Sequence, residues 1–555
     1  MKRPRIKALQ LVKAEDNHRK IGMQYLVRNI IIPLSDMTPE NEWKLIRMAS
    51  SKHMGISERD IRDLRIVRES IDARKKNELA CVYSVLASID GHIRTAKNIQ
   101  LFQPLQVPSV PAAAPTTRPV IIGAGPCGLF CAFELAERGF LPIIVERGEE
   151  IEKRTQSVKA FWTKGILNPE SNVQFGEGGA GTFSDGKLTT RINDPRCTRV
   201  LEIFHACGAP EEILYKARPH IGTDVLKNIM VALRKKLTDK GAEFLFSTRM
   251  DSLLVKNDRV RGVKLSDGRE IDTPAVVLAI GHSARDTFAG LCRQGIQMQQ
   301  KPFSVGVRIE HLQEWINEAQ YGKVRHFKLG AADYQLYEHL GERTAYSFCM
   351  CPGGIVVAAA SEENSIVTNG MSYHARNGIN ANSAYVVSVS PSDFGGVHPL
   401  AGMEYQRRLE RSCYKKTEGK GAPVQKLSDF LNDVPSRKPG TVKPSYTGET
   451  VFTSLSDILP SYVVSGIKQS LPAFERKLKG FMHPDALLTA IETRTSSPVR
   501  MMRNDLFQSV SMGGLFPAGE GAGYAGGIVS AAVDGIRVAE QVARKFASED
   551  GGKTI

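Results

Sequence analysis

Three glycines, Gly123, Gly125 and Gly128, lie in the segment "IIGAGPCG", and their spacing constrains the fold more than any other feature of the chain. The preceding "PVII" predicts a buried strand, and "CGLFCAFELAERG" predicts a helix that ends at Gly139. In this context the first glycine allows a tight turn, the second lets the backbone approach a pyrophosphate, and the third lets the helix pack on the sheet. The sequence therefore predicts an α/β fold with a dinucleotide-binding strand–turn–helix unit.

The second predicted strand, "PIIVER", ends at Glu146, 18 residues after Gly128. An acid at this place accepts hydrogen bonds from ribose hydroxyls and repels a 2′-phosphate. Arg147 follows directly and weakens that argument, because an arginine can bind such a phosphate. A strand–helix–strand unit without a ligand is the alternative interpretation.

A second glycine-rich segment, "PAGEGAGYAGGIVSAA", occupies residues 517–532 near the end of the chain. The preceding "GLF" predicts a strand, and the residues from Gly527 predict a C-terminal helix. FAD is long, so both of its ends need a helix N-terminus or an acid. We expect Glu520 to bind the ribityl hydroxyls, and the helix start at Gly527 and Ile528 to stabilise the anionic reduced flavin. A glycine-rich helix cap is the alternative.

A meander is predicted between these two glycine clusters. It follows an amphipathic helix over 223–241, and the turn signals Asn257-Asp258 and Asp267-Gly268 separate its strands. A strand that lies after this three-stranded meander ends in the turn Ala279-Ile280-Gly281. Flavoproteins often carry a similar turn after such a meander, so Gly281 is expected at the cofactor.

A proline-rich stretch over 102–119, with five prolines and almost no charge, divides the chain. In the segment before it we expect a strand over 24–34, a helix from an N-cap at Thr38 to Gly55, and strands over 63–74 and 80–90. The predicted units are a basic N-terminal α+β domain of ferredoxin-like type (1–100), a linker (101–118), a discontinuous Rossmann-like FAD-binding domain (119–300 and 490–546), a mixed α+β substrate domain (301–489) and a tail (547–555).

The net charge of +15 is concentrated at the start of the chain, where residues 1–100 carry 20 basic and 12 acidic side chains. This charge suits RNA or another polyanion, but no nucleic-acid motif accompanies it, so a plain basic surface is favoured. We see no signal peptide and no apolar run long enough to span a membrane. Nine cysteines are too few for a disulfide scaffold, which favours the cytoplasm. The sequence does not indicate an oligomeric state.

The chain resembles the FAD-dependent oxidoreductases of the glutathione-reductase structural class. It is most similar to a bacterial family labelled FAD-dependent, or NAD/FAD-utilising, dehydrogenase. The segments that carry this resemblance are "NVQFGEGGAGTFSDGKL" (172–188), "FCMCPGGIVVAAASEENSIVTNGMS" (348–372), "ETRTSSPVR" (492–500) and "GEGAGYAGGIVSAAVDG" (519–535). The resemblance implies FAD as the cofactor and does not indicate a substrate.

The resemblance also implies positions for further residues. A loop placed like 176–187 lies along the pyrophosphate and flavin in that class, so we expect the following residues near the cofactor: Gly179, Gly181, Ser184 and Lys187. Lys187 would also neutralise reduced flavin. Met250, at the start of the meander, is expected to contact adenine through its backbone. A tight loop that only supports the first helix is the alternative for 176–187.

Four residues are candidates for catalysis, namely Cys349, Cys351, His282 and Arg494. Cys349 and Cys351 form a CxC pair that suits packing, a flavin-facing thiol or redox chemistry, and their spacing fits neither the common CxxC redox motif nor a zinc site. His282 and Arg494 are candidates for binding an anionic substrate above the flavin, although either fits a structural role. No metal site is predicted.

These features together predict an oxidoreductase that moves a hydride or electron pair between a small organic substrate, or NAD(P)H, and an acceptor. After residue 300 no second GxGxxG stands between a strand and a helix, so NADH or NADPH would bind only transiently. Two alternatives stay open: a flavin enzyme that modifies RNA through the basic N-terminal domain, and a flavin-binding sensor without catalysis.

Overall fold

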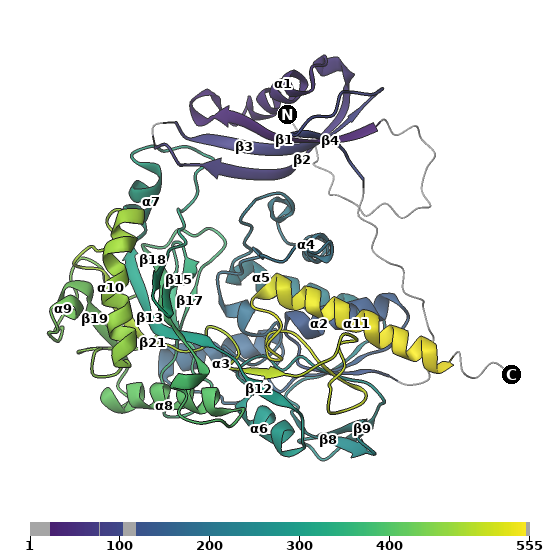
Figure 1. The fold of residues 1–555 in the computed structure, drawn as a ribbon, viewed down its shortest axis with the longest axis vertical. Coiled ribbons are helices and arrows are strands. Elements are labelled where there is room, and N and C mark those ends of the chain that lie inside the picture. Colours follow the sequence, from purple (N-terminus) through teal and green to yellow (C-terminus); the bar gives the residue numbers. More distant parts are fainter. Residues whose placement is uncertain (1–22, 77, 104–117, 551–555) are drawn as a thin grey trace.

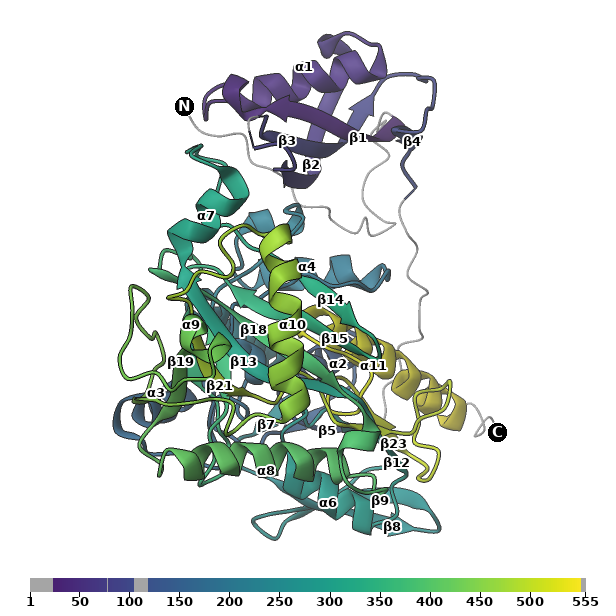
Figure 2. The same cartoon turned by 60° about the vertical axis from the view of Figure 1, so that its left-hand side comes forward.

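The computed structural model describes residues 23–76, 78–103 and 118–550, which form a mixed α/β structure (Figure 1). The predicted linker lies almost wholly outside these ranges, and so does the end of the predicted tail. An N-terminal sheet stands apart from the rest of the chain, which is built around a parallel sheet and a larger seven-stranded sheet (Figures 1 and 2). None of the helices within the described ranges is long and apolar enough to cross a bilayer.

The glycine fingerprint lies in the parallel sheet, between β5 (Val120–Ile122) and α2 (Pro126–Glu137), as predicted. All neighbouring strands of this sheet run parallel, in the order β23-β11-β5-β6-β7. The other strands are β6 (Ile143–Val145), β7 (Glu243–Leu245), β11 (Val276–Leu278) and β23 (Leu515–Pro517). The segment from residue 515 thus returns to the edge of the sheet that the fingerprint strand helps to form.

The last helix, α11 (Ile528–Asp550), packs closely on α2. A Cβ atom added at Gly535 of α11 would stand 2.1 Å from the carbonyl oxygen of Cys127 on α2, so a glycine is needed at this contact. The predicted C-terminal strand and helix are both confirmed, and they bring the two glycine-rich segments side by side.

The predicted amphipathic helix and meander are also confirmed. Helix α5 (Thr223–Asp239) precedes the meander of β8 (Met250–Lys256), β9 (Arg259–Leu265) and β10 (Glu270–Asp272). Asn257 and Asp258 both have positive φ, 52° and 54°, as a tight hairpin turn requires. Three further helices belong to this part of the chain: α3 (Ile151–Lys164), α4 (Arg196–Ala206) and α6 (Arg285–Arg293).

The seven-stranded sheet has the order β14-β15-β18-β13-β21-β19-β20. Its strands are β14 (Tyr337–Leu340), β15 (Arg343–Cys351), β18 (Asn380–Val389), β13 (Phe303–Leu312), β21 (Leu487–Glu492), β19 (Ala422–Lys426) and β20 (Thr450–Phe452). Its helices are α7 (Gln313–Tyr321), α8 (Ala401–Lys416), α9 (Leu427–Leu431) and α10 (Ser461–Lys477), of which α10 runs along the sheet (Figure 2). A hairpin of β16 (Ile355–Ala358) and β17 (Thr368–Met371) packs beside the sheet.

The predicted boundary between residues 489 and 490 cuts through a strand of this sheet. β21 (Leu487–Glu492) pairs with β13 on one side and β19 on the other, so it belongs wholly to the seven-stranded sheet. Shortly after it, β22 (Val499–Met501) pairs with β12 (Met298–Gln300) in a separate two-stranded sheet. β12 lies between β11 of the parallel sheet and β13 in the sequence. Any division of the chain here must therefore fall after Glu492.

The N-terminal sheet has the order β2-β3-β1-β4, with β1 (Met23–Pro33), β2 (Ile61–Asp72), β3 (Ala80–Ile89) and β4 (Ile99–Leu101). This strand order is that of a ferredoxin-like sheet, but residues 90–98, between β3 and β4, form no second helix. Helix α1 (Glu42–Met54) ends at Gly55 in the left-handed conformation, as predicted. Its N-cap is Asn41 rather than Thr38, because Thr38 and Asn41 close a turn with each other before the helix begins.

The N-terminal domain contacts the rest of the chain through its strand β2. The backbone N–H of Glu69 donates to the carbonyl of Tyr215 at 2.8 Å, and the N–H of Ala217 returns a bond to the Glu69 carbonyl at 2.8 Å. The ammonium of Lys328 also lies 2.5 Å from a carboxylate oxygen of Glu42 and 3.1 Å from one of Glu69. These contacts fix the edge of the N-terminal sheet to the body of the protein.

Candidate functional site

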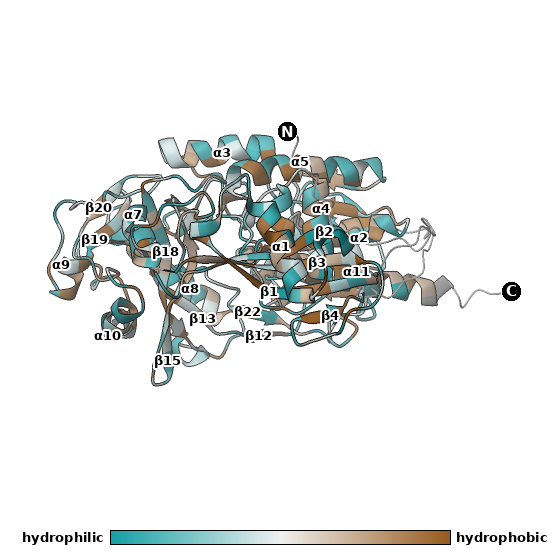
Figure 3. Ribbon diagram, turned by 90° about the horizontal axis from the view of Figure 1, so that it is seen from above, coloured by the Kyte–Doolittle hydropathy of each residue, from teal (hydrophilic) through white to brown (hydrophobic). Residues whose placement is uncertain are grey.

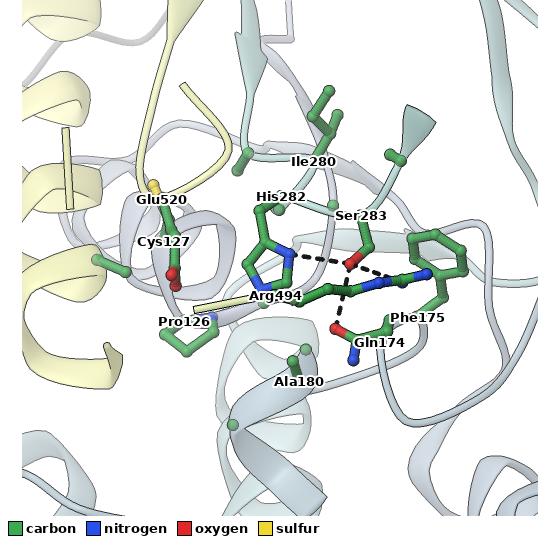
Figure 4. Close-up of a pocket in the computed structure, with 18 of the residues that line it drawn as sticks. Pro126, Cys127, Gln174, Phe175, Ala180, Ile280, His282, Ser283, Arg494 and Glu520 are labelled. Atoms are coloured by element: carbon green, nitrogen blue, oxygen red, sulfur yellow. Dashed lines mark hydrogen bonds between the residues drawn. The ribbon is translucent and has the colours of Figure 1, made fainter. Parts of the chain in front are cut away.

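One pocket collects side chains from segments far apart in the sequence, and Figure 4 shows part of it. Its empty volume is about 1600 Å³, part of which is open to solvent. The turn between β5 and α2, the loop over 174–187 and the start of α11 form one part of its wall. Strands β15, β17 and β21 of the seven-stranded sheet supply another part.

Nearly all of the site residues predicted from the sequence line this pocket. They are Gly123, Gly125, Glu146, Arg147, Gly179, Gly181, Ser184, Lys187, Met250, Gly281, His282, Cys349, Cys351, Arg494, Glu520, Gly527 and Ile528. Gly128 does not line it. A Cβ atom at Gly128 would stand 1.9 Å from the carbonyl oxygen of Gly123, so this glycine serves the packing of α2 on β5.

Gly123 and Gly125 have different physical reasons to be glycine. Gly123 has a φ of +106°, and a Cβ there would lie 2.3 Å from the carbonyl oxygen of Ala279. Gly125 has ordinary extended backbone, and a Cβ there would meet only Gly179 Cα, at 3.7 Å. The protein itself therefore does not require glycine at 125. A side chain there would enter the pocket, which is what a ligand lying against the turn would forbid.

Two helices begin at the pocket. Helix α2 starts directly after Gly125, and α11 starts directly after Gly527, whose φ of +104° and open surroundings leave its backbone accessible. The N-terminus of a helix carries free N–H groups and a partial positive charge, which suit phosphate and other anions. The glycine cradle and the two helix starts therefore fit the phosphates and the flavin end of a dinucleotide.

Glu146 is buried and accepts three backbone hydrogen bonds. They come from the N–H groups of Ala124 (2.8 Å), Gly148 (2.9 Å) and Gly176 (2.9 Å). A carboxylate offers about four lone-pair positions, so about one remains for a ribose hydroxyl. Glu146 thus ties the fingerprint turn to the 176 loop, a role that its place at the end of β6 does not reveal.

Arg147 is already engaged within the protein. Its guanidinium forms paired hydrogen bonds with Glu170 and Asp286 at 2.8–3.1 Å and lies 4.2 Å from the ring centroid of Phe175. A 2′-phosphate would have to compete with two carboxylates for this side chain. The geometry accordingly assigns Arg147 to the wall of the pocket.

Arg154, which the sequence analysis did not single out, organises the loop that forms the floor of the site. Its side chain is fully buried and donates to the backbone carbonyls of Asn172, Val173, Gly176, Glu177 and Gly179 at 2.6–3.2 Å. Desolvation lowers its pKa to about 10, so it keeps its charge at neutral pH. In the sequence, Arg154 could have been recognised as an arginine on the apolar face of an otherwise hydrophilic helix. Helix α3 lies on the outside of the molecule and is largely hydrophilic (Figure 3), and its other buried residues are Ile151 and Val158.

Arg494, a predicted anion-binding residue, is neutralised by a buried carboxylate. Its guanidinium contacts Glu410 at 3.0–3.1 Å and Ser361 at 2.6 Å. Glu410 also binds Arg285 at 2.8–2.9 Å. Burial alone would raise the pKa of Glu410, but Arg285 and Arg494 hold it well below its ordinary value. This network joins α6, α8 and the residues after β21 behind the pocket.

His282 lies beside Arg494 in the pocket, with its ring Nδ1 at 2.9 Å from the Ser283 hydroxyl (Figure 4). Burial and the charges of Arg494 and Arg285 lower the pKa of His282 to about 3. The imidazole is therefore neutral at physiological pH and suits hydrogen bonding rather than charge pairing.

Both cysteines of the CxC pair line the pocket, but they differ in exposure. Cys349 has a positive φ of 43° and an exposed side chain that lines the pocket, whereas Cys351 is buried. The Cys351 thiol donates to the Cys349 carbonyl at 3.3 Å. Desolvation raises the pKa of Cys349 to about 12, which keeps it a neutral thiol at physiological pH. All nine cysteines fall within the described ranges, and all are free.

Glu520 and Ser184 line the part of the pocket near the start of α11. Glu520 is half-buried, and desolvation raises its pKa to about 7, against the lowering effects of the Gly527 N–H and Lys301. The Ser184 hydroxyl is engaged with its own loop, donating to the Gly181 carbonyl at 2.6 Å and accepting from the Gly186 N–H at 3.1 Å.

The comparison with protein families first defines the class. Residues 302–495, which span most of the seven-stranded sheet, match the model described as "FAD-dependent protein, C-terminal domain-like". Residues 24–88, in the N-terminal sheet, match a domain of unknown function. The fingerprint turn and the C-terminal glycine segment thus share a pocket with a domain typical of FAD-dependent proteins.

The family follows from a full-length relative. An uncharacterized protein of Clostridium beijerinckii is 47% identical over 541 residues, which cover 94% of this chain and 99% of the relative. The chain belongs to the same family as this clostridial protein, a family of FAD-dependent proteins.

Several solved structures are similar at a lower level. The flavin-dependent brominase Bmp2 is 12% identical with a TM-score of 0.36, and the alignment covers 79% of this chain and 80% of that one. A flavoprotein/dehydrogenase from Cytophaga hutchinsonii is 11% identical with a TM-score of 0.35 over 79% and 80% of the two chains. The tetracycline destructase Tet(51) is 11% identical with a TM-score of 0.33 over 78% and 83%.

Proposed function

We propose that the protein is an FAD-dependent oxidoreductase that moves a hydride or an electron pair between a small organic substrate, or NAD(P)H, and an acceptor. The observation that carries this proposal is the shared pocket. In it, the glycine turn at 123–125 and the start of α11 at 527–528 lie in one pocket with strands β15, β17 and β21. These strands belong to the domain that matches the family model of FAD-dependent proteins. One part suits a dinucleotide, and the other leaves room for a second molecule.

The residues that would hold FAD follow from their places in the pocket. The N–H groups after Gly125 would receive the pyrophosphate, and the remaining acceptor position of Glu146 would take a ribose hydroxyl. Met250, at the start of β8, would border the adenine, and Glu520 would accept from the ribityl chain. When bound, FAD supplies two-electron redox chemistry, which no side chain of the pocket supplies by itself.

We further propose that residues 119–300 and 496–546 form the FAD-binding part, of Rossmann-like type. The seven-stranded sheet over 302–495 would then be the substrate domain. This division moves the expected boundary past Glu492 and agrees with the range of the matching family model. NADH or NADPH would reach the flavin from the open side of the pocket and leave again after transfer.

The proposal is tested on the purified full-length protein. It should be yellow, denaturation should release FAD rather than FMN, and anaerobic mixing with NADH, NADPH or a metabolite panel should bleach the flavin absorption. A colourless protein that cannot be reconstituted with FAD would overturn the proposal. Flavin that no donor in the panel reduces would favour the alternative of a flavin-binding sensor.

Replacing Glu520 by alanine should weaken FAD retention by about 10- to 100-fold, since a hydrogen bond to a charged group contributes about 1.5–3 kcal/mol. FAD affinity is measured by titrating the apoprotein and following the quenching of flavin fluorescence. Glu363→Ala, an exposed glutamate outside the pocket, is the matched control and should bind like the wild type. Equal affinities of the two variants would remove Glu520 from the site.

The RNA alternative rests on the basic N-terminal domain, whose excess charge of +8 includes +5 from residues 1–22, which lie outside the described residues. Arg74 pairs with Asp72, and Lys75 pairs with Glu78, so basic residues near the β2–β3 hairpin have local counter-charges. Unpaired surface cations are what phosphate backbones select. Salt-dependent RNA binding that disappears on deleting residues 1–100 would restore this alternative. Cytoplasmic location stays a prediction.

A further inference from the structure

The wall that the seven-stranded sheet gives to the pocket contains a buried guanidinium–carboxyl pair. Glu492 is the last residue of β21 and lines the pocket, and its Oε1 lies 3.6 Å from Nη1 of Arg308 on β13. Arg308 is fully buried. Its Nη2 donates to the Asn382 side-chain oxygen and, at 3.0 Å, to the Cys349 carbonyl. Its Nη1 makes no hydrogen bond within the described part of the chain.

The carboxyl of Glu492 is also weakly held. Within the described ranges its hydrogen-bond partner is the hydroxyl of Thr368 on β17, at a long 3.5 Å. Glu492 is 4% exposed, and this burial raises its pKa to about 7, which Arg308 and Thr368 only partly offset. A polar group that is buried with poor partners costs free energy unless a ligand satisfies it.

A lysine completes this part of the pocket. Lys187 follows η3 (Ala180–Phe183), is half-buried and lines the pocket, and its ammonium forms no ion pair within the described residues. The charges of Lys187 and Glu492 act in opposite directions on the pKa of the Cys349 thiol, and all three residues line the pocket. Asn369 and Gly370 line the wall beside them.

The charges at this place do not balance. Arg308 and Lys187 carry two positive charges, and Glu492 carries at most one negative charge. The other charges nearby have partners: Arg376 pairs with Asp185, Arg494 shares Glu410 with Arg285, which also pairs with Glu362, and Glu310 interacts with Arg308. Lys187 is the cation of this wall that forms no ion pair within the described residues. A half-closed pocket with excess positive charge selects an anion.

We propose that the sheet side of the pocket binds a small carboxylate-bearing molecule between the ammonium of Lys187 and the carboxyl of Glu492. Arg308 acts as a positioning residue that holds Glu492 and the Cys349 carbonyl. The site deepens the proposed function, because it would be the substrate site of the FAD-dependent oxidoreductase, and it rests on that function for the cofactor that fills the rest of the pocket.

Binding of such an anion must take up a proton. A carboxylate close to Glu492 disfavours its ionised form, so binding draws a proton onto Glu492, which then donates a hydrogen bond to the ligand. Below the pH at which free Glu492 ionises, the affinity should be constant. Above pH ~7 it should fall by about tenfold per pH unit, the limit for one linked proton. The groups that act on Glu492 are Arg308 and Thr368, and its charge acts in turn on the Cys349 thiol. Burial raises the pKa of Cys349 to about 12, so this thiol stays neutral while Glu492 titrates.

The experiment uses the FAD-loaded full-length protein and titrates it with acetate, lactate and benzoate, and with the neutral amides of these three acids. Isothermal calorimetry in two buffers of different ionisation enthalpy counts the protons taken up, and the visible flavin spectrum reports binding beside the cofactor. We expect at least one carboxylate to bind, its amide to bind at least ~10-fold more weakly, and proton uptake to rise towards one above neutral pH.

Variants then assign the two groups. Glu492→Gln should bind the carboxylate without proton uptake and with an affinity that no longer depends on pH, whereas Lys187→Met should lose at least ~10-fold in affinity. The matched controls are Glu202→Gln and Lys227→Met. Glu202 is a partly buried carboxyl whose pKa burial raises to about 7, Lys227 is a half-buried lysine, and neither lines the pocket.

Three outcomes would overturn the inference. They are carboxylates that do not bind at tens of millimolar, carboxylates that bind no better than their amides, and wild-type binding without proton uptake; none of these needs a variant that folds. The anion could also be the reduced flavin itself. If Lys187→Met changes the pKa of the reduced flavin but does not change the affinity for any carboxylate, the site serves the cofactor and the proposal fails. A protein that holds no FAD would instead contradict the proposed function, because calorimetry still reports carboxylate binding without flavin.

Discussion

Replacing Gly125 by valine is expected to give a folded but colourless protein. A Cβ at this position would meet only Gly179 Cα, at 3.7 Å, so the first side-chain atom causes no clash, and a branched side chain there would stand in the pocket beside the start of α2. In the proposed FAD site the backbone N–H groups after Gly125 bind the pyrophosphate. Loss of about two such charge-assisted hydrogen bonds, at about 1.5–3 kcal/mol each, should lower FAD affinity by about 100-fold or more. Flavin content per protein and fluorescence-quenching titration of the apoprotein measure this loss.

Two other glycines provide the controls for Gly125→Val. Gly330→Val adds the same side chain at an exposed glycine with no heavy atom within 4 Å, and it should keep its FAD. Gly128→Ala should instead lower the yield of folded protein, because its Cβ would stand 1.9 Å from the Gly123 carbonyl oxygen. If Gly125→Val retains FAD like Gly330→Val, no ligand lies against the turn.

Replacing Arg154 by methionine should unfold the loop over 172–179 and lower the free energy of unfolding by about 3–5 kcal/mol. Five backbone carbonyls lose their donor, and a buried acceptor without a partner costs about 1–3 kcal/mol, of which water entering the loop recovers a part. FAD retention should fall together with stability, since Gly176 and Gly179 line the pocket. Guanidinium unfolding with matched measurements of flavin content tests both effects.

The neighbouring residue offers a matched control for Arg154→Met. Lys153, one position earlier on α3, has a side chain that is 66% exposed and pairs with Glu150, the N-cap residue of this helix. Lys153→Met should therefore change stability by less than about 0.5 kcal/mol. Arg154→Lys should not restore the wild-type midpoint, because one ammonium has three donors and cannot reach five carbonyls. An Arg154→Met protein with the wild-type midpoint and flavin content would contradict this account of the loop.

Local patterns predicted much of the architecture. Glycine spacing between an apolar strand and an apolar helix depends on adjacent residues, so the β5–α2 turn was visible, and the turn at Asn257-Asp258 was equally local. Composition could not separate Thr38 from Asn41 as the helix cap, because both side chains can accept the capping bond and only the three-dimensional turn decides. The ferredoxin-like prediction had the right strand order but one helix too many, since nothing in the sequence alone fixes how residues 90–98 connect two strands.

The sequence predicted those site residues whose role depends on a glycine or an acid at a fixed place in a local motif. It did not predict those whose role depends on pairing between distant segments of the chain. Arg285 and Glu410 meet across 125 positions of sequence, and Arg494 joins them from a third segment. No periodicity links such partners, so Arg494 was predicted as an anion-binding residue although its charge is already paired. No role was predicted for Glu492, because its weak hydrogen bonding results from the packing of β13, β17 and β21, which local sequence does not reveal.

The return of β23 to the edge of the parallel sheet has a consequence for biosynthesis. β5 is complete at Ile122, but its sheet gains its last strand only at Leu515–Pro517. At translation rates of about 5–20 residues per second, roughly 20–80 s separate the two events. For that time α2 lacks the helix that covers it. β11, complete at Leu278, presents an open edge for roughly 12–47 s of it at the same rates. Such surfaces are the kind on which nascent chains aggregate. Ribosome-associated chaperones would prevent such aggregation. Folding of the β5–β11 region only after β23 has been synthesised would have the same effect.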